Sequence, residues 1–169
     1  MTVFSATFTA ATISVAQDMF EILAPSTSRV IVHEVVLSQH SAGDFVDAQA
    51  EILPLTIVRG HSVSGSGGST AGVANLNPYG RAAVSTVERN NTTGASSGSP
   101  EILWADGWHV QAGFIWRLSE RLHSLGTEGK IMLKPSQRLV VRIGAPADSL
   151  DGVNGTLLFE EIGVVPVAA

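Results

Sequence analysis

A regular two-residue rhythm of apolar and polar side chains is the feature that most limits what this chain can fold into. In the strongest example, residues 108–118, one parity is apolar and the other carries polar residues or glycine. The apolar parity consists of Trp108, Val110, Ala112, Phe114, Trp116 and Leu118. The rhythm returns where Leu139, Val141 and Ile143 alternate with Arg138 and Arg142. Because successive side chains of a strand point to opposite faces, this rhythm predicts sheets with one dry and one wet face.

Several short segments with strand signals are separated by turns rich in Gly, Pro and Asn. These segments are residues 2–12, 18–23, 29–39, 52–58, 83–87, 102–104, 108–118, 130–133, 137–143 and 156–162. Residues 119–125 could add one or two helical turns, and no long helix is expected. We therefore predict an all-β fold, an antiparallel two-sheet sandwich of about nine or ten short strands. A jelly roll is the first choice of topology, and another sandwich is the second.

Three segments depart from simple alternation. Residues 29–39 are apolar on both parities, which predicts a strand covered on both faces, by an extra layer or by a subunit contact. Pro54 cannot donate to a ladder, so residues 52–58 are expected at a sheet edge or around a bulge. Residues 60–80 are rich in Gly and Ser and show no periodicity. They predict a long loop, and such loops in compact domains are usually functional or disordered.

The composition favours one domain whose surface is partly covered by another chain. We assign residues 1–169 to a single β-sandwich, with an N-terminal strand or arm at 1–12 and a tail at 163–169. Only 15% of the residues are charged, against about 25% in typical domains. The mean hydropathy is +0.25, which is high for a free monomer and suggests a covered surface.

Composition also weighs against several partners. The net charge of −5 and the scattered arginines argue against a nucleic-acid surface. No apolar stretch approaches the roughly 18 residues of a membrane span, and no signal peptide is expected. We therefore predict neither nucleic acid nor membrane as a partner.

No residue cluster predicts catalysis or a cofactor. The chain has no cysteine, and its five histidines lack the close spacing of metal ligands. Glu160 and Glu161 are neighbours on a predicted strand, so they point to opposite faces and cannot share a proton. Asp148, Asp151 and Asn154 lie in a loop without the ordered pattern of a calcium site, which favours a hydrogen-bonded turn. We expect no enzyme activity, no metal and no cofactor.

Two further patterns bear on possible binding sites: a glycine-rich segment and the tryptophans. Residues 65–70 superficially resemble a phosphate-binding loop, but the Gly-Lys-Ser/Thr ending and a following helix are missing. Trp108 and Trp116 share the parity of core residues, which places them inside the sandwich. Trp104 leaves open an exposed aromatic platform of the kind that sugar-binding sandwiches use.

Five segments carry a resemblance to a known group of proteins. They are residues 59–62, 64–70, 90–93, 135–142 and 146–150. In order and spacing the whole chain resembles small proteins encoded among the structural genes of tailed bacteriophages. The resemblance implies a virion component, most plausibly a capsid decoration (cement) protein that assembles in the host cytoplasm. Such proteins often have jelly-roll or related β folds and bind the outside of the shell as homotrimers, so the implied partners are the major capsid protein and other copies of the chain.

Three segments suit the clamping role that this resemblance implies. Residues 2–10, the loop 60–80 and the apolar tail 164–167 could each be laid over a partner as an added strand. In a trimer, several such contacts would act together. The candidate partner-contact residues are Thr2, Phe4, Phe8, Val73, Leu76, Tyr79, Val164 and Val165. The alternative function is a carbohydrate- or receptor-binding β-sandwich module of a tail or fibre.

Overall fold

The structure is a computed structural model that describes residues 2–40, 50–117 and 130–163. Those residues form twelve strands and no helix, which confirms the all-β class. The strands are β1 (Thr2–Ile13), β2 (Gln17–Leu23), β3 (Ser28–Gln39), β4 (Ile52–Val63), β5 (Ser69–Thr70), β6 (Gly72–Asn75), β7 (Thr86–Asn91), β8 (Ser96–His109), β9 (Phe114–Arg117), β10 (Ile131–Leu133), β11 (Arg138–Ile143) and β12 (Leu150–Gly163). No helix among the described residues could cross a membrane. The helical turns expected at 119–125 lie outside the described residues.

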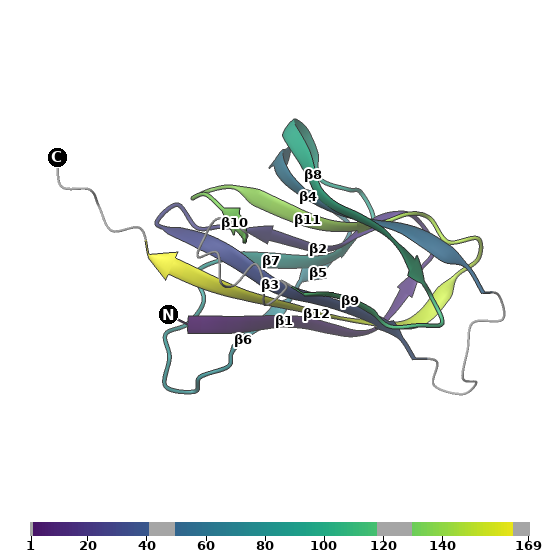
Figure 1. Ribbon diagram of the computed structural model, residues 1–169, viewed down its shortest axis with the longest axis horizontal. Coiled ribbons are helices and arrows are strands. Elements are labelled where there is room, and N and C mark those ends of the chain that lie inside the picture. The colour runs from purple at the N-terminus through teal and green to yellow at the C-terminus, as the bar shows by residue number, and fades with distance from the viewer. Residues whose placement is uncertain (1, 41–49, 118–129, 164–169) are drawn as a thin grey trace.

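The strands form two packed antiparallel sheets (Figure 1). Sheet A has the order β10-β3-β12-β1-β6, and β9 also pairs with β3. Sheet B has the order β5-β7-β2-β11-β4-β8. The set β1-β12-β3-β9 therefore faces the set β2-β11-β4-β8, which is the strand order of a jelly roll. This confirms the first choice of topology.

Aromatic rings from both sheets fill the core. Phe4 of β1 stacks on Phe159 of β12 with ring centroids 5.5 Å apart. Phe8 of β1 meets Phe20 of β2 across the sandwich at 5.1 Å. Gly155 of β12 lies directly against this second pair, because a Cβ atom there would lie 2.9 Å from Phe20 Cε2 and closer still to the ring of Phe8. The absence of a side chain at residue 155 thus lets the two rings meet.

Replacing Gly155 with alanine is expected to lower the free energy of unfolding by about 1–3 kcal/mol. The added methyl group would overlap the Phe8 ring, and neither ring has empty space to move into because both are buried. Urea denaturation measures the effect. Gly72→Ala is the matched control, since a Cβ atom at that strand position meets nothing within 4 Å. Equal stability of the two variants would contradict this account of the core.

The doubly apolar pattern of residues 29–39 has a different cause from the expected second layer or subunit contact. The register of β3 on β12 shifts between Leu158 and Phe159, so that one extra residue of β3, at position 33, forms a β-bulge. The bulge reverses the parity that faces the core. The buried core residues of β3 are therefore Val30, Val32, Val35 and Leu37, which belong to both parities. Ile31 is also buried but does not belong to that core cluster.

The expected position of Pro54 at an edge or bulge is wrong. β4 lies inside sheet B, between β11 and β8, and its register shifts lie further along at 57–58 and 59–61. Pro54 accepts a hydrogen bond from the backbone N–H of Gly144, one residue beyond the end of β11. The backbone N and C=O of a strand residue point to the same side. The nitrogen of Pro54, which has no hydrogen to donate, therefore also points past the end of β11, where β11 offers no ladder partner and no hydrogen bond is lost.

Residues 108–118 do not form one strand. β8 ends at His109 in sheet B, and β9 begins at Phe114 in sheet A. A turn closed by a 2.9 Å hydrogen bond from the N–H of Ala112 to the carbonyl of His109 carries the chain between the sheets. Trp108 and Trp116 are both buried, as the alternation predicts, because the crossing preserves the inward parity of the two strands.

The N-terminal segment is the predicted strand, and the 60–80 segment contains more regular structure than expected. β1 pairs with β12 on one side and β6 on the other, so residues 2–10 are a strand inside sheet A and not an arm. The 60–80 connection contains the end of β4, all of β5 and all of β6. The short β5 and β6 each extend a sheet by one strand, although two to four residues are too few to show a period in the sequence. The tail at 164–169 lies outside the described residues.

Candidate interaction surface

A bulge in β2 places two buried carboxylates on the outer face of sheet B. The pairing with β11 shifts so that Val141 opposes Phe20 while Arg142 opposes Asp18, which leaves Met19 as the extra residue. Met19 and Phe20 both belong to the core cluster. Asp18 and Glu21, three positions apart, consequently both point outward, yet both are buried.

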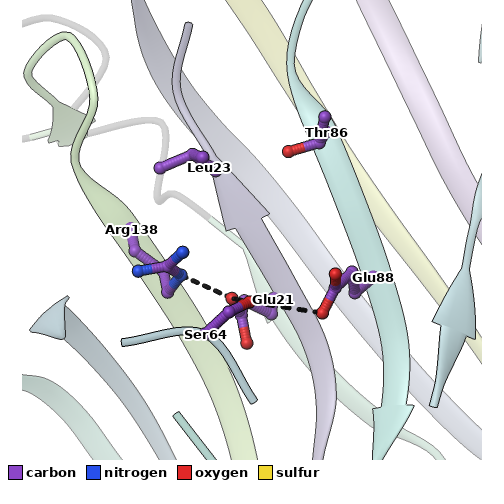
Figure 2. Close-up of a pocket in the computed structure, with 6 residues that line it drawn as sticks. All are labelled: Glu21, Leu23, Ser64, Thr86, Glu88 and Arg138. Atoms are coloured by element: carbon purple, nitrogen blue, oxygen red, sulfur yellow. Dashed lines mark hydrogen bonds and ion pairs between the residues drawn. The ribbon is translucent and has the colours of Figure 1, made fainter. Parts of the chain in front are cut away.

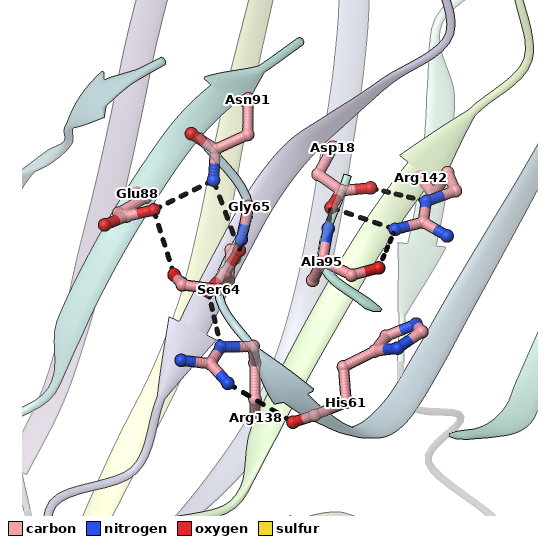
Figure 3. A network of polar contacts seen from close by, with 10 residues as sticks. Asp18, His61, Ser64, Gly65, Glu88, Asn91, Ala95, Arg138 and Arg142 are labelled. Carbon is pink, nitrogen blue, oxygen red and sulfur yellow. Dashed lines mark hydrogen bonds and ion pairs between the residues drawn. The ribbon is translucent and has the colours of Figure 1, made fainter. Parts of the chain in front are cut away.

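Asp18 is held by an arginine and by a backbone amide. Arg142 of β11 donates to both carboxylate oxygens, at 2.6 and 3.1 Å. The N–H of Ala95 donates to Asp18 at 2.7 Å, and Arg142 donates to the carbonyl of Ala95 at 2.8 Å (Figure 3). The hydrogen bond to Asp18 raises the pKa of Arg142 above its usual value. This arrangement fastens residue 95 onto the outer face of sheet B.

Glu21 is the centre of the second cluster. It forms an ion pair with Arg138 (Figure 2) and accepts a hydrogen bond from Ser64 Oγ at 2.5 Å. It also accepts one from the N–H of Gly65 at 2.9 Å (Figure 3). Asn91 Nδ2 donates to Glu21 at 3.2 Å and to Glu88 at 2.9 Å. These contacts fix the start of the glycine-rich segment 64–68 on sheet B, where a flexible loop was expected.

The Glu21 cluster is structural in character. The hollow between Glu21, Ser64, Glu88 and Arg138 has a volume of about 100 Å³, smaller than the 300 Å³ or more of typical ligand pockets. The polar groups that line it donate to or accept from one another. Ser64 donates its hydroxyl proton to a carboxylate that already neutralises an arginine, which is not the arrangement of an activated nucleophile.

Other described acidic residues also have partners within the chain. Glu160 contacts His33 on one side of β12, at 3.2 Å, while Glu161 pairs with Arg81 at 2.9 Å. The two carboxylates thus have separate partners, as predicted from their adjacent positions on a strand. The hydrogen-bonded turn expected around Asp148, Asp151 and Asn154 is wrong for the last two residues, because both lie in β12. Their side chains bind the neighbouring strand β1: Asp151 accepts a hydrogen bond from Thr12 Oγ1 at 2.7 Å, and Asn154 accepts one from the N–H of Ala10 at 3.1 Å. Among residues 2–40, 50–117 and 130–163, no group of three or more acidic, His or Cys side chains could hold a metal ion.

The β6–β7 connection, which runs next to the N-terminus of β1 (Figure 1), carries three exposed apolar residues. We call Leu76, Tyr79 and Val84 the loop patch. All three are exposed, and Tyr79 is 97% exposed. Asn75 and Asn77 organise the connection, because Asn75 Nδ2 donates to the carbonyl of residue 81 at 2.6 Å and the N–H of Tyr79 donates to Asn77 Oδ1 at 3.1 Å.

A buried carboxylate anchors the loop patch to the sandwich. Glu161 accepts hydrogen bonds from the N–H groups of Val84 and Ser85, at 2.8 and 2.6 Å, in addition to its ion pair with Arg81. Leu76 is fixed at the other end, where its N–H donates to the carbonyl of Val3 at 3.1 Å. The loop therefore presents Tyr79 from a backbone held at both ends.

A second group of exposed apolar residues occupies the opposite side of the sandwich. They are Ile102 and Trp104 on β8 and Ile115 on β9, and they face different ways. Ile102 pairs with Val58 on the outer face of sheet B, Trp104 pairs with the core residue Ile57, and Ile115 pairs with Val36 on the outer face of sheet A. Trp104 is 45% exposed and packs edge-on against the buried ring of Trp116, with centroids 6.4 Å apart. Trp104 is therefore the accessible member of the three tryptophans.

The structure separates the candidate contact residues into three groups. Phe4 and Phe8 are buried in the core, so they cannot contact a partner without unfolding β1. Their side chains point into the core, where Phe4 packs on Phe159 and Phe8 packs on Phe20 of the other sheet. The residues that the structure leaves at least partly accessible near β6 are Thr2, Val73, Leu76 and Tyr79. Val164 and Val165 lie outside the described residues.

Asp18, Glu21 and Glu161 are the structurally important residues that sequence patterns missed. Asp18 and Glu21 fall on different parities, so alternation alone would place them on opposite faces. A sequence signal for these two carboxylates exists on β11, where Arg138 and Arg142 share a parity. If another segment covers that face of the sheet, both arginines become partly buried and need anions close by. Glu161 gave no signal, because its partners at 81–85 lie in a loop.

Comparison with known proteins gives little further information. No family model matches the chain, and no curated protein matches it. One similar solved structure comes from the single-particle analysis of Maize Chlorotic Mottle Virus: identity is 9%, the TM-score is 0.30, and 100% of this chain and 96% of that chain are covered. Another is VP17, a capsid protein of bacteriophage P23-77, with 11% identity, a TM-score of 0.13, and 94% and 88% of the chains covered. At such TM-scores neither likeness carries an argument.

Proposed function

We propose that this protein is a non-enzymatic structural component of a virion, which binds the outer surface of a phage capsid as a homotrimer and stabilises the shell. The observation that carries the proposal is the loop patch. It is an exposed apolar surface on a loop whose backbone is tied to both β1 and β12. Binding to a partner costs such a loop little conformational entropy, because the loop is already ordered.

The distribution of charge supports a role in adhesion. The buried carboxylates of sheet B are neutralised by arginines of the same chain. The exposed ion pairs also join residues of the same chain. One of them joins Arg117 to Glu34, and the hydrogen bond from Arg117 to Glu34 raises the pKa of Arg117. The exposed apolar side chains are then the groups whose burial by a partner would lower the free energy of the complex. The resemblance to tailed-phage structural proteins suggests the major capsid protein as that partner, and the virion as the location.

A homotrimer would strengthen a weak contact. Each copy would bring one loop patch, and after the first patch binds, the others would bind at a raised effective concentration. Three modest apolar contacts can thus hold a shell that one contact could not. The alternative, a carbohydrate-binding module of a tail or fibre, stays a prediction, with Trp104 as its accessible aromatic side chain.

The test is binding to shells assembled without this protein, taken from the phage that encodes it. The wild-type protein is expected to sediment with the shells and to raise their disruption temperature. Tyr79→Ser should weaken binding by about 30-fold, the effect of losing an aromatic contact worth about 2 kcal/mol. Val63→Ser is the matched control, since Val63 is an exposed apolar residue at the far end of β4 and should bind like the wild type.

Two results would count against this proposal. Wild-type protein that fails to sediment with the shells would refute the capsid role. Equal binding by Tyr79→Ser and Val63→Ser would show that the loop patch does not make the contact. Both variants alter exposed side chains, so their unfolding curves should match that of the wild type and show that folding is intact.

A further inference from the structure

β6 is the outermost strand of sheet A, and its free edge offers backbone groups that β1 does not use. The N–H of Leu76 donates to the carbonyl of Val3, and bonded pairs alternate with non-bonded pairs along an antiparallel ladder. The backbone of Ala74 is therefore also bonded to β1, whereas the N–H and C=O groups of Val73 and Asn75 point away from it. No described strand lies beyond β6 on that side.

The free edge of β6 lacks the features that keep other strands from adding to a sheet. Its sequence, Gly-Val-Ala-Asn, contains no charged residue and no proline. By contrast, the outermost strand β8 of sheet B contains Pro100, and its pairing with β4 shifts twice. The side chain of Val73 is partly buried and packs against the core, so the inner side of the β6 edge is apolar. Such an edge recognises an extended polypeptide with apolar side chains on alternate residues.

We propose that the apolar tail of a second copy, residues 164–167, adds to β6 as an antiparallel strand and so joins the copies of the homotrimer, an inference that rests on the proposed function. Val165 would exchange two backbone hydrogen bonds with Asn75, and Val167 would exchange two with Val73. Directly opposed side chains lie on the same face of a sheet, so Val167 would cover the partly buried side chain of Val73. Each copy would give its tail to the next copy, a heterologous contact that can close into a ring.

The sequence of the tail suits this pairing. Residues 164–167 are Val-Val-Pro-Val, which carry no charge and include three β-branched side chains. Pro166 lies between the two residues that would bond to β6, so its nitrogen would point away from β6 and its missing donor would cost no hydrogen bond. On the outer side, the same proline would hinder the addition of a further strand.

The tail of the same copy is too short to occupy this edge. Asn75 lies level with Phe4 and Phe159 in sheet A, and Gly163 lies four residues beyond Phe159 on β12. The added strand would lie three strand spacings from β12, so the position opposite Asn75 is about 20 Å from Gly163. Val165 is two residues beyond Gly163, and two residues span at most about 7 Å. A tail on this edge therefore comes from another copy.

The first experiment measures molar mass by light scattering over a range of concentrations. Wild-type protein is expected to be trimeric, and protein truncated after Gly163 is expected to be monomeric at the same concentration. Val165→Pro removes the donor that faces Asn75 and should weaken each tail contact about tenfold. Val164→Pro is the matched control, because the nitrogen at position 164 points the same way as that of Pro166, and it should assemble like the wild type.

The second experiment locates the contact on β6. A peptide of residues 163–169 is titrated into the protein truncated after Gly163, and amide hydrogen exchange is read by NMR. Exchange of the Val73 and Asn75 amides should slow about tenfold when the peptide is bound, because each gains an acceptor. The Leu76 amide already has its acceptor in β1 and should not change. The same peptide with Val165→Pro should bind about ten times more weakly.

The outcomes distinguish this inference from the proposed function. If the truncated protein stays trimeric, or if Val164→Pro and Val165→Pro assemble equally, the tail does not pair with β6, while shell binding by the wild type can still stand. Truncation that dissociates the trimer without any peptide effect on the Val73 and Asn75 amides places the tail on another surface and also overturns the inference. If both experiments give the expected results but no protein sediments with shells, the inference holds and the capsid role fails. A wild-type protein that is monomeric at all concentrations overturns the inference.

Discussion

Replacing Asp18 with alanine is expected to lower the free energy of unfolding by about 3–5 kcal/mol, the cost of leaving one partner of a buried ion pair alone. Asp18 is fully buried and receives three hydrogen bonds, two from Arg142 and one from the N–H of Ala95. Without the carboxylate, the partly buried guanidinium of Arg142 stays charged with no counter-ion at this position, and the N–H of Ala95 loses its hydrogen-bond acceptor. Urea denaturation followed by circular dichroism measures the change.

Two further variants test the cause of that loss. The pair Asp18→Leu with Arg142→Met removes both charges, and its stability should return most of the way to that of the wild type. Glu101→Gln removes a carboxylate of a solvent-exposed ion pair with Arg59, so its unfolding midpoint should not change. If Asp18→Ala unfolds at the same urea concentration as Glu101→Gln, the cluster does not stabilise the sandwich.

Alternation of side chains was enough to predict the class of fold and much of the core. In β11 and in residues 153–159 of β12 the core residues keep a period of two, and Leu139, Val141, Leu157 and Phe159 are those that the apolar parity predicts. The jelly-roll order was a choice among sandwiches, because the pairing of β1 with β12 joins residues more than a hundred positions apart. A local pattern contains no information about such partners.

The errors occur where the period of two is broken or misleading. Bulges at residues 19 and 33 add one residue to a strand, so that residues of both parities reach the same face. A bulge is caused by packing against the neighbouring strand, and the sequence of β2 or β3 alone does not show it. Between β8 and β9 the opposite happens: the parity continues although the chain crosses from one sheet to the other.

The candidate contact residues show the same limit. Phe4 and Tyr79 were both selected as apolar residues in segments able to contact a partner. The structure buries Phe4, because its side chain points into the core between the two sheets and stacks on Phe159, whereas Tyr79 is left almost fully exposed. Tyr79 lies in the connection that follows β6, the strand that pairs with β1 from about seventy positions away in sequence. Apolar composition identifies residues that need cover, and only the tertiary structure shows which of them already have it.

Replacing Glu21 with alanine is expected to release the segment 64–68 from sheet B and to lower the free energy of unfolding by about 3–5 kcal/mol. Glu21 accepts the N–H of Gly65, the hydroxyl of Ser64 and an amide hydrogen of Asn91, and it neutralises Arg138. One lost hydrogen bond to a charged group is worth about 1.5–3 kcal/mol, so the Gly65 amide should exchange with solvent at least about ten times faster. Hydrogen exchange read by NMR measures this directly.

Glu88→Gln provides the matched control for Glu21→Ala. Glu88 lies opposite Glu21 on β7 and contacts Asn91 and Ser64, but the structure gives it no ion pair with an arginine among the described residues. Its neutralisation should leave the Gly65 amide protected, and it removes the repulsion between two carboxylates that face each other across the strands. Faster exchange of Gly65 in Glu21→Ala but not in Glu88→Gln would assign the ordering of the segment to Glu21. Equal protection in both would mean that the glycine-rich segment is held by its own backbone contacts, such as the bridge of Ser66 with Thr93, and that the buried carboxylate serves only Arg138.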